Sequence, residues 1–209
     1  MISDQINEFS SALESDVSDF GVTALSADQI SQLVKHYDMI CRWNKRINLT
    51  RIISPRDAAR LHYAESLFGA RFIRERTVLD IGSGAGFPAI PLAVIRPEVR
   101  VTALEANHKK ALFLIEARDA LRLANFEVVT ARLEEFDWSD YELLTSRALD
   151  QAEAVLPLVI EQMSSNQRLM LYCGPDLIAK LQRKSSAACR VETNPIPFSE
   201  SRILAILSH

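Results

Sequence analysis

Three closely spaced glycines are the residues of this chain whose spacing most directly predicts chemistry. Gly82, Gly84 and Gly86 follow a short apolar run, residues 77–81, and precede an apolar stretch of helical character. In a strand–turn–helix unit, glycines let the backbone approach a ligand closely, and the helix N-terminus offers N–H groups to that ligand. The alternative is an ordinary turn that happens to use glycine. Because three of the six glycines lie in this one loop, we favour a ligand-binding loop.

Two neighbours of these glycines indicate which ligand the loop would bind. A dinucleotide fingerprint has its third glycine one position later, where this chain has Phe87. Asp80 would lie awkwardly close to a pyrophosphate, whereas its carboxylate suits the amino or sulfonium group of S-adenosylmethionine. The sequence therefore predicts a site for this methyl donor and disfavours a nicotinamide-dependent oxidoreductase.

Polar residues also follow the other predicted strands, at the edge where an open α/β sheet binds its ligands. Glu105 could accept both hydrogen bonds of a ribose diol, or it could be a solvated charge before a helix. Residues 131–135 could present a backbone N–H and a carboxylate to an adenine edge. Arg147 either lies beside the donor and acceptor or forms a structural ion pair.

From residue 77 onward, strand-like and helix-like segments alternate, which predicts right-handed crossovers and a mostly parallel sheet with helices on both faces. We expect strands near 77–81, 100–104, 126–130, 141–146 and 167–172. We expect helices near 86–95, 108–123, 150–163 and 175–184. The runs 189–196 and 202–207 are expected to close the chain as an antiparallel hairpin at the sheet edge.

The segment before the sheet is predicted to be helical. A first helix is expected over residues 3–15, followed by a polar break over 15–23. Ser26 and Gln29 have the spacing of a capping box for a second helix that ends near Trp43. After a connector, Ser54-Pro55 begins a third helix, since proline suits the first helical position. We expect residues 1–73 to pack as a helical region on the methyl-donor-binding domain, residues 74–209, in one structural unit.

Composition indicates a globular chain of 209 residues, 48% of them hydrophobic and 24% charged. The three cysteines are odd in number, show no metal-ligand spacing and fit a reducing compartment. No apolar run approaches the roughly 20 residues of a membrane span. The acidic N-terminus lacks the basic start of a signal peptide. We therefore expect a cytoplasmic protein that binds neither membrane nor metal.

Charge is distributed unevenly along the helical region. Residues 1–30 hold six acidic side chains and no Lys or Arg. Residues 31–62 hold seven basic and two acidic side chains, a local balance of +5. Such asymmetry is typical of a polyanion-binding face, and a solvated helix surface is the alternative.

Several segments occur in the order of one known family over about residues 30–207. They are 42–50 (Arg-Trp-Asn-Lys-Arg-Ile-Asn-Leu-Thr), 62–67, 79–92, 105–110, 113–114, 131–136 and 145–148. On these segments the chain resembles the 16S rRNA guanine-N7 methyltransferases, also known as the glucose-inhibited division protein B family. The first segment is the most specific, because it lies outside the generic methyltransferase core.

The resemblance implies a Rossmann-like class I methyltransferase with a seven-stranded sheet, S-adenosylmethionine as cofactor and 16S rRNA or its ribonucleoprotein as partner. The implied catalytic residues are Arg147, Asn48 and His62. The implied cofactor contacts are Asp80, Gly82, Gly84, Gly86, Phe87, Glu105, Leu133, Glu134 and Arg147. The implied RNA contacts are Arg42, Lys45, Arg46, Arg51, Arg60, Lys109 and Lys110. We expect a monomer.

The chain departs from the family at a few of these positions. It has Glu65 where the family has Asp, and Cys173 where the family usually has Lys. His62 is either a residue of the catalytic face or a hydrogen-bonded core histidine.

Guanine N7 carries an in-plane lone pair and no proton, so its methylation needs alignment rather than a general base. Three other functions are weighed against this one: a small-molecule methyltransferase, a nicotinamide oxidoreductase, and a non-catalytic RNA-binding relative. The first would leave the basic segment without purpose.

Overall fold

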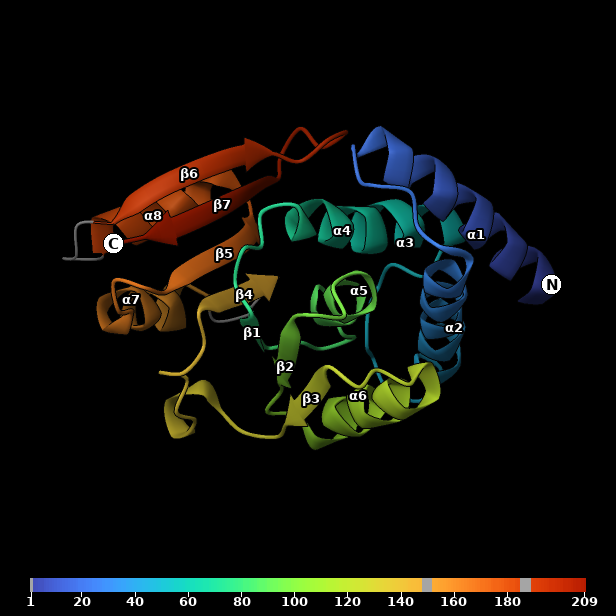
Figure 1. Ribbon diagram of the computed structural model, residues 1–209, viewed down its shortest axis with the longest axis horizontal. Helices are drawn as coiled ribbons and strands as arrows, with labels where there is room; N and C mark the ends of the chain where they lie inside the picture. The colour runs from blue at the N-terminus through green and yellow to red at the C-terminus, as the bar shows by residue number, and fades with distance from the viewer. Residues whose placement is uncertain (1, 148–151, 185–188) are drawn as a thin grey trace.

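Seven strands form one sheet, in a computed structural model that describes residues 2–147, 152–184 and 189–209 (Figure 1). The strands are β1 (Thr77–Ile81), β2 (Arg100–Leu104), β3 (Phe126–Val129), β4 (Leu143–Arg147), β5 (Arg168–Cys173), β6 (Arg190–Pro195) and β7 (Ile203–Ser208). Their order is β3-β2-β1-β4-β5-β7-β6. The first five are parallel, and β7 pairs antiparallel with β5 and β6. The predicted mostly parallel sheet with a C-terminal antiparallel hairpin is confirmed.

Helices cover both faces of this sheet, as alternation of strand and helix predicts (Figure 1). They are α5 (Ala89–Ile95), α6 (His108–Leu121), α7 (Ala152–Gln162) and α8 (Pro175–Lys184). Successive side chains of a strand point to opposite faces, so Val78 packs in the core with α5 and α6, whereas Leu79 packs with α7 and α8. The helix predicted from residue 86 begins at Ala89, because the glycine turn extends further than its glycines.

The N-terminal region is helical, with one boundary that differs from the prediction. It comprises α1 (Ile2–Asp19), α2 (Ala27–Trp43) and a continuous segment of α3 (Pro55–Ala58), the π-helix η1 (Ala59–Ala64) and α4 (Glu65–Ala70). The break expected from residue 15 is wrong, since α1 continues to Asp19. Asp16 is buried at 4% exposure and paired with Arg60, so this polar residue belongs to the packed face of α1.

Predicted start signals of these helices are confirmed. Ser26 and Gln29 form the reciprocal capping box of α2. The Ser54 side chain caps α3, with Pro55 in its first turn.

The helical region shares a core with the sheet. Phe9 of α1 stacks on Tyr37 of α2 at a centroid distance of 4.2 Å and meets Tyr63 of η1 edge-on at 4.9 Å. These rings belong to the same buried cluster as α5, α6 and one face of the sheet. The tip of the β6–β7 hairpin reaches the end of α1 (Figure 1), where Phe198 lies 5.7 Å from Phe20.

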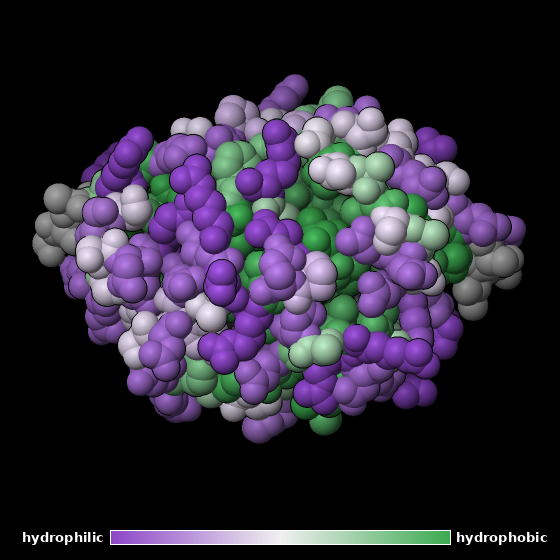
Figure 2. All heavy atoms as spheres, in the orientation of Figure 1, coloured by the Kyte–Doolittle hydropathy of each residue, from purple (hydrophilic) through white to green (hydrophobic). Residues whose placement is uncertain are grey.

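Hydrophilic residues cover most of the molecular face seen in Figure 2, and apolar residues are visible through its middle. Within the described residues, no helix is long and apolar enough to cross a membrane.

Candidate methyl-donor and RNA site

The glycine loop lies where the order of the sheet reverses. β1 has β2 on one side and β4 on the other, so the carboxyl end of β1 lies at a topological switch point. Gly84 and Gly86 have φ angles of +56° and +88°, which L side chains rarely adopt. A Cβ on Gly86 would also come within 2.6 Å of Ile90 Cδ1. The loop therefore needs glycine both for its backbone conformation and for its packing on α5.

Asp80 lies within β1 just before this loop and is completely buried. Neither of its carboxylate oxygens has a hydrogen-bond partner among the described residues. Burial raises the pKa of Asp80 to about 8. A buried carboxyl group without a partner is unfavourable unless a ligand or another group satisfies it. The residue therefore fits a cationic ligand group, and this arrangement suits S-adenosylmethionine.

Glu105, after β2, is also buried, at 7% exposure, but its carboxylate is bonded to backbone. Its Oε2 accepts from the Gly84 N–H at 2.8 Å, and its Oε1 accepts from the Asn107 N–H at 2.8 Å. A carboxylate has about four acceptor positions, so two remain for a ribose diol. Glu105 thus fixes the glycine loop and still has acceptor capacity toward a ligand.

Arg147, at the carboxyl end of β4, reaches across to the π-helix η1. Its guanidinium donates to the carbonyls of Leu61 and His62, the latter at 3.1 Å, and to His62 Nδ1 at 3.1 Å. Glu65 Oε2 lies 3.7 Å from it. Burial lowers the pKa of Arg147 to about 10, so the guanidinium remains charged at neutral pH. The structural ion pair, one of the two alternatives for Arg147, is therefore present, and its place beside the donor or acceptor stays a prediction.

His62 is buried, and both of its ring nitrogens are engaged. Nε2 lies 2.8 Å from Thr50 Oγ1, and Nδ1 faces the Arg147 donor. Because a guanidinium only donates, Nδ1 accepts and Nε2 carries the hydrogen. Burial lowers the pKa of His62 to about 3. Phe87 stacks on this ring at 4.5 Å. These contacts are those of a hydrogen-bonded core histidine.

The connector 44–54 carries Asn48 and is joined to His62 through Thr50. The Asn44 side chain accepts from the N–H groups of Leu49 and Thr50 and donates to the Thr50 carbonyl at 2.9 Å. Asn48 is exposed. Asn44 and Thr50, both in the family-specific segment 42–50, therefore shape the connector and join it to His62. The sequence pattern alone does not reveal these contacts.

Leu133 and Glu134 lie in a single turn of 3₁₀ helix, η2 (Leu133–Glu135), after β3. Together with Trp138 and Leu158, they line a cavity of about 200 Å³. Leu133 is half-buried and Glu134 is exposed. The end of α7 forms part of the cavity wall, and none of the residues that line the cavity belongs to the glycine loop.

The predicted RNA-binding side chains fall into two groups. Arg42 is paired with Asp38, and Arg60 is paired with the buried Asp16 at 2.7 Å. The others have no ion-pair partner among the described residues: Lys45, Arg46, Arg51, Lys109 and Lys110. Of these, only Lys110 is half-buried; the rest are exposed. The acidic helix α1 thus neutralises part of the basic segment.

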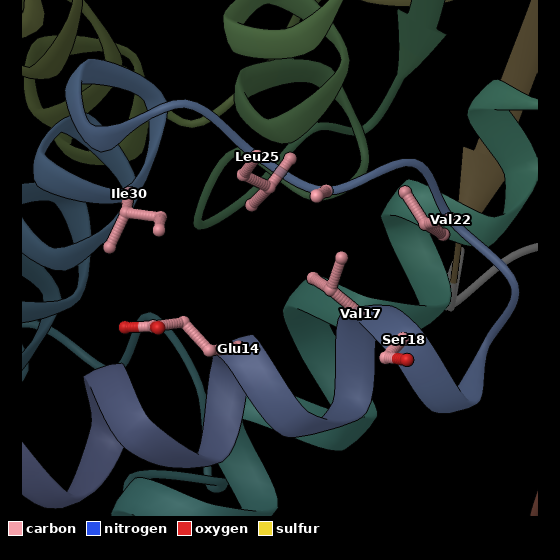
Figure 3. A pocket seen from close by; sticks show the side chains of 7 residues that line it. Glu14, Val17, Ser18, Val22, Leu25 and Ile30 are labelled. Atoms are coloured by element: carbon pink, nitrogen blue, oxygen red, sulfur yellow. The ribbon is translucent and has the colours of Figure 1, made fainter.

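Two other cavities involve the N-terminal helices. One, of about 640 Å³, separates α1 from α3 and η1, where Arg56 pairs with Glu8 at 3.0 Å. The other, of about 220 Å³, lies between α1, α2 and their connection, and Val17, Leu25 and Ile30 line it (Figure 3). None of the residues that line the smaller cavity is a predicted site residue.

Sequence reasoning missed Arg202, which joins the hairpin to the ligand edge. Its guanidinium donates to Glu65 Oε1 at 2.5 Å, so Glu65 bridges Arg147 and Arg202. Burial raises the pKa of Glu65. Arg202 follows Glu65 by 137 positions, and no local pattern marks it. Cys173, by contrast, is buried, and burial raises the pKa of its thiol to about 11, so it does not replace the lysine's charge.

No group of three or more His, Cys, Asp or Glu residues with metal-binding geometry occurs in the part of the chain that the structure describes. Among the described residues, this edge holds the glycine loop, the three buried carboxyl groups of Asp80, Glu105 and Glu65, and the guanidinium groups of Arg147 and Arg202.

Comparison with solved structures places the fold in the class of Rossmann-like methyltransferases. The mitomycin 7-O-methyltransferase MmcR has a TM-score of 0.60 at 18% identity, over 81% of this chain and 60% of that one. A SAM-dependent O-methyltransferase from Thermotoga maritima has a TM-score of 0.56 at 17% identity, over 83% and 71%. At these identities the likeness concerns the fold alone.

The sequence comparisons are more specific. The chain belongs to the GidB family, rRNA small subunit methyltransferase G, whose profile matches residues 29–202. The ribosomal RNA small subunit methyltransferase G of Solibacter usitatus is 41% identical over 165 residues, 77% of this chain and 78% of the relative. The protein of that name in Ruthia magnifica is 34% identical over 151 residues, 72% and 74%. The predicted family is confirmed.

Proposed function

We propose that this protein transfers the methyl group of S-adenosylmethionine to N7 of a guanine in 16S rRNA. The observation that carries this proposal is the buried, unpartnered Asp80 carboxyl group beside a preformed glycine loop. Membership of the rRNA small subunit methyltransferase G family supports the reaction class and the substrate.

Each part of the cofactor would meet a different element of the sheet edge. Asp80 would hold a cationic group, and Glu105 would accept hydrogen bonds from the ribose with its remaining lone pairs. Leu133 and Glu134 would contact the adenine. Phe87 would close the side of the site toward η1. When bound, S-adenosylmethionine supplies the electrophilic methyl group.

The residues toward the base would align it rather than remove a proton. Guanine N7 needs no general base, and His62 is neutral with both nitrogens engaged, so it is not required as one. We assign Arg147 and Asn48 to orienting the guanine, and His62 to joining Arg147 with the connector that carries Asn48. In this assignment His62 acts as a positioning residue.

RNA phosphates would contact the exposed cations at Lys45, Arg46, Arg51, Lys109 and Lys110. Arg42 and Arg60 would contribute only if a phosphate displaced Asp38 or Asp16. Phosphate contacts fix register without specifying the base. The proposed partner is 16S rRNA or the small-subunit particle, bound by a monomer in the cytoplasm.

Calorimetric titration of the purified protein with S-adenosylmethionine and with NAD tests the cofactor assignment. We expect binding of the methyl donor and none of NAD. Binding of NAD alone would favour an oxidoreductase. Donor binding with methyl transfer to a small molecule but to no RNA would favour a small-molecule methyltransferase, and donor binding without any transfer would favour an inactive relative.

A further inference from the structure

His36 lies on α2, far from the glycine loop in sequence, yet it is fully buried against that loop. Its Nε2 lies 3.0 Å from the Ala85 carbonyl oxygen, and its Nδ1 lies 2.9 Å from the Tyr63 hydroxyl. A carbonyl oxygen can only accept, so Nε2 carries the hydrogen and Nδ1 accepts from Tyr63. Both ring nitrogens are therefore satisfied in one tautomer.

Ala85 occupies the centre of the loop, between two glycines with positive φ angles. The neighbouring Gly84 N–H donates to Glu105, which follows β2. The Ala85 carbonyl receives its hydrogen bond from the opposite side, from the helical region. The loop is thus held from the sheet through Glu105 and from α2 through His36.

Aromatic rings fix the imidazole in this position. Phe87 lies at a centroid distance of 5.3 Å and Phe113 at 5.9 Å from His36. Burial lowers the pKa of His36 to about 3, so the ring is neutral at physiological pH and keeps both hydrogen bonds. The side chain has no exposed surface through which it could contact a ligand directly.

We propose that His36 is a positioning residue for the cofactor: its bond to the Ala85 carbonyl holds the glycine loop in its binding conformation before the cofactor arrives. This role rests on the proposed function, because it assigns the loop to S-adenosylmethionine. A preorganised loop binds more tightly, since less conformational freedom is lost on binding.

The next residue supplies a matched control. The Tyr37 hydroxyl donates to the Ile53 carbonyl at 2.8 Å, in the connector that carries Asn48. His36 and Tyr37 are adjacent, buried and hydrogen-bonded to a backbone carbonyl, but they hold different loops. Loss of the Tyr37 hydroxyl should therefore leave the glycine loop unchanged.

The test compares His36→Phe and His36→Asn, which lack a donor at the Nε2 position, with His36→Gln, whose amide nitrogen reproduces it, and with Tyr37→Phe. The dissociation constant of S-adenosylhomocysteine is measured by calorimetry without RNA. Hydrogen exchange of the residue 82–87 amides is measured without ligand. Melting temperatures show which variants fold. His36→Phe and His36→Asn differ in size, so the test needs only one of these two donor-free variants to fold.

We expect the donor-free variants to bind about tenfold more weakly and to exchange faster in the loop. His36→Gln should recover most of the affinity, and Tyr37→Phe should match the wild type. Wild-type exchange and affinity in a folded donor-free variant would overturn the proposal, as would a His36→Gln variant as impaired as His36→Asn. If the wild type bound no S-adenosylhomocysteine, the proposed function would fail, while the exchange measurement would still decide the role of His36.

Discussion

The glycine loop and the connector 44–54 both reach His62, through Phe87 and Thr50, but they are built differently. The loop is mostly buried, and its backbone is held from opposite sides: the Gly84 N–H donates to Glu105, and His36 donates to the Ala85 carbonyl. The connector is largely exposed and is shaped mainly by the side chains of Asn44 and Thr50. One side is part of the core, and the other is a surface loop.

The difference in burial predicts how each side would select its ligand. Beside the loop, a single buried carboxyl group at Asp80 would recognise charge in a water-excluded environment, where an electrostatic interaction is strong. Along the connector, several exposed cations act through water, where each interaction is weak and sensitive to salt. Cofactor affinity should therefore depend strongly on one residue, whereas RNA affinity should be distributed over many.

Arg147 joins the two sides, so its loss should have the largest effect. We expect Arg147→Ala to lower kcat/KM by about a hundredfold or more while the fold survives, because the contacts between β4 and η1 are lost. Arg168→Ala is the control, since Arg168 forms a comparable ion pair with Glu75 at the other end of the sheet. Unchanged turnover in Arg147→Ala would remove this residue from the site.

Asp80→Asn should weaken binding of S-adenosylmethionine by about thirtyfold, because a desolvated charge pair is lost. The melting temperature of the free protein should not fall, since the buried carboxyl group has no partner. Asp16→Asn gives the opposite pattern: Asp16 is buried but paired with Arg60, so stability should fall and cofactor affinity should persist. Equal effects of both substitutions on affinity would contradict the assignment of Asp80.

The pH dependence of cofactor binding gives a second test of the role of Asp80. Burial raises the pKa of Asp80 to about 8, so in the free protein this carboxyl group is largely protonated at pH 7. Cofactor affinity should rise as pH increases from about 6 to about 8, with release of a proton. Because the folded state binds the extra proton, its free energy of unfolding should decrease from about pH 4 to about pH 8.

Calorimetry in two buffers of different ionisation enthalpy measures the proton release. The Asp80→Asn variant should show no such release and a flatter affinity profile. A wild type that binds the cofactor at pH 7 without releasing a proton would show that Asp80 is already ionised and would contradict this part of the account.

The smallest expected effect concerns the RNA side. Arg46→Gln should reduce the salt dependence of rRNA binding by about one phosphate contact. Arg56→Gln should reduce it less, because Glu8 already neutralises Arg56. Fluorescence anisotropy with an rRNA fragment over a range of salt concentrations measures both slopes. Equal slopes for the two variants would mean that pairing with α1 does not matter for RNA binding.

The contrast between the two sides also explains what the sequence could predict. Glycine spacing and strand pattern are local signals, and they predict the position of the loop and the order of the elements as the structure has them. The bonds of Arg202 to Glu65 and of His36 to Ala85 join residues far apart in sequence, and no spacing rule reports them. The end of α1 was misplaced for the same reason, because Asp16 is stabilised by Arg60, 44 positions away. Tertiary packing also decides which basic residues are already in ion pairs, so the sequence does not predict them.

The most direct test of the proposed function is methyl transfer from labelled S-adenosylmethionine to small-subunit rRNA from a strain that lacks this gene. Naked rRNA and small-subunit particles are tested in parallel, with tRNA as control, and the modified base is mapped by cleavage specific for N7-methylguanine. We predict one N7-methylguanine in 16S rRNA and no label in tRNA. Absence of label from both rRNA and particles, with the cofactor bound, would contradict the account.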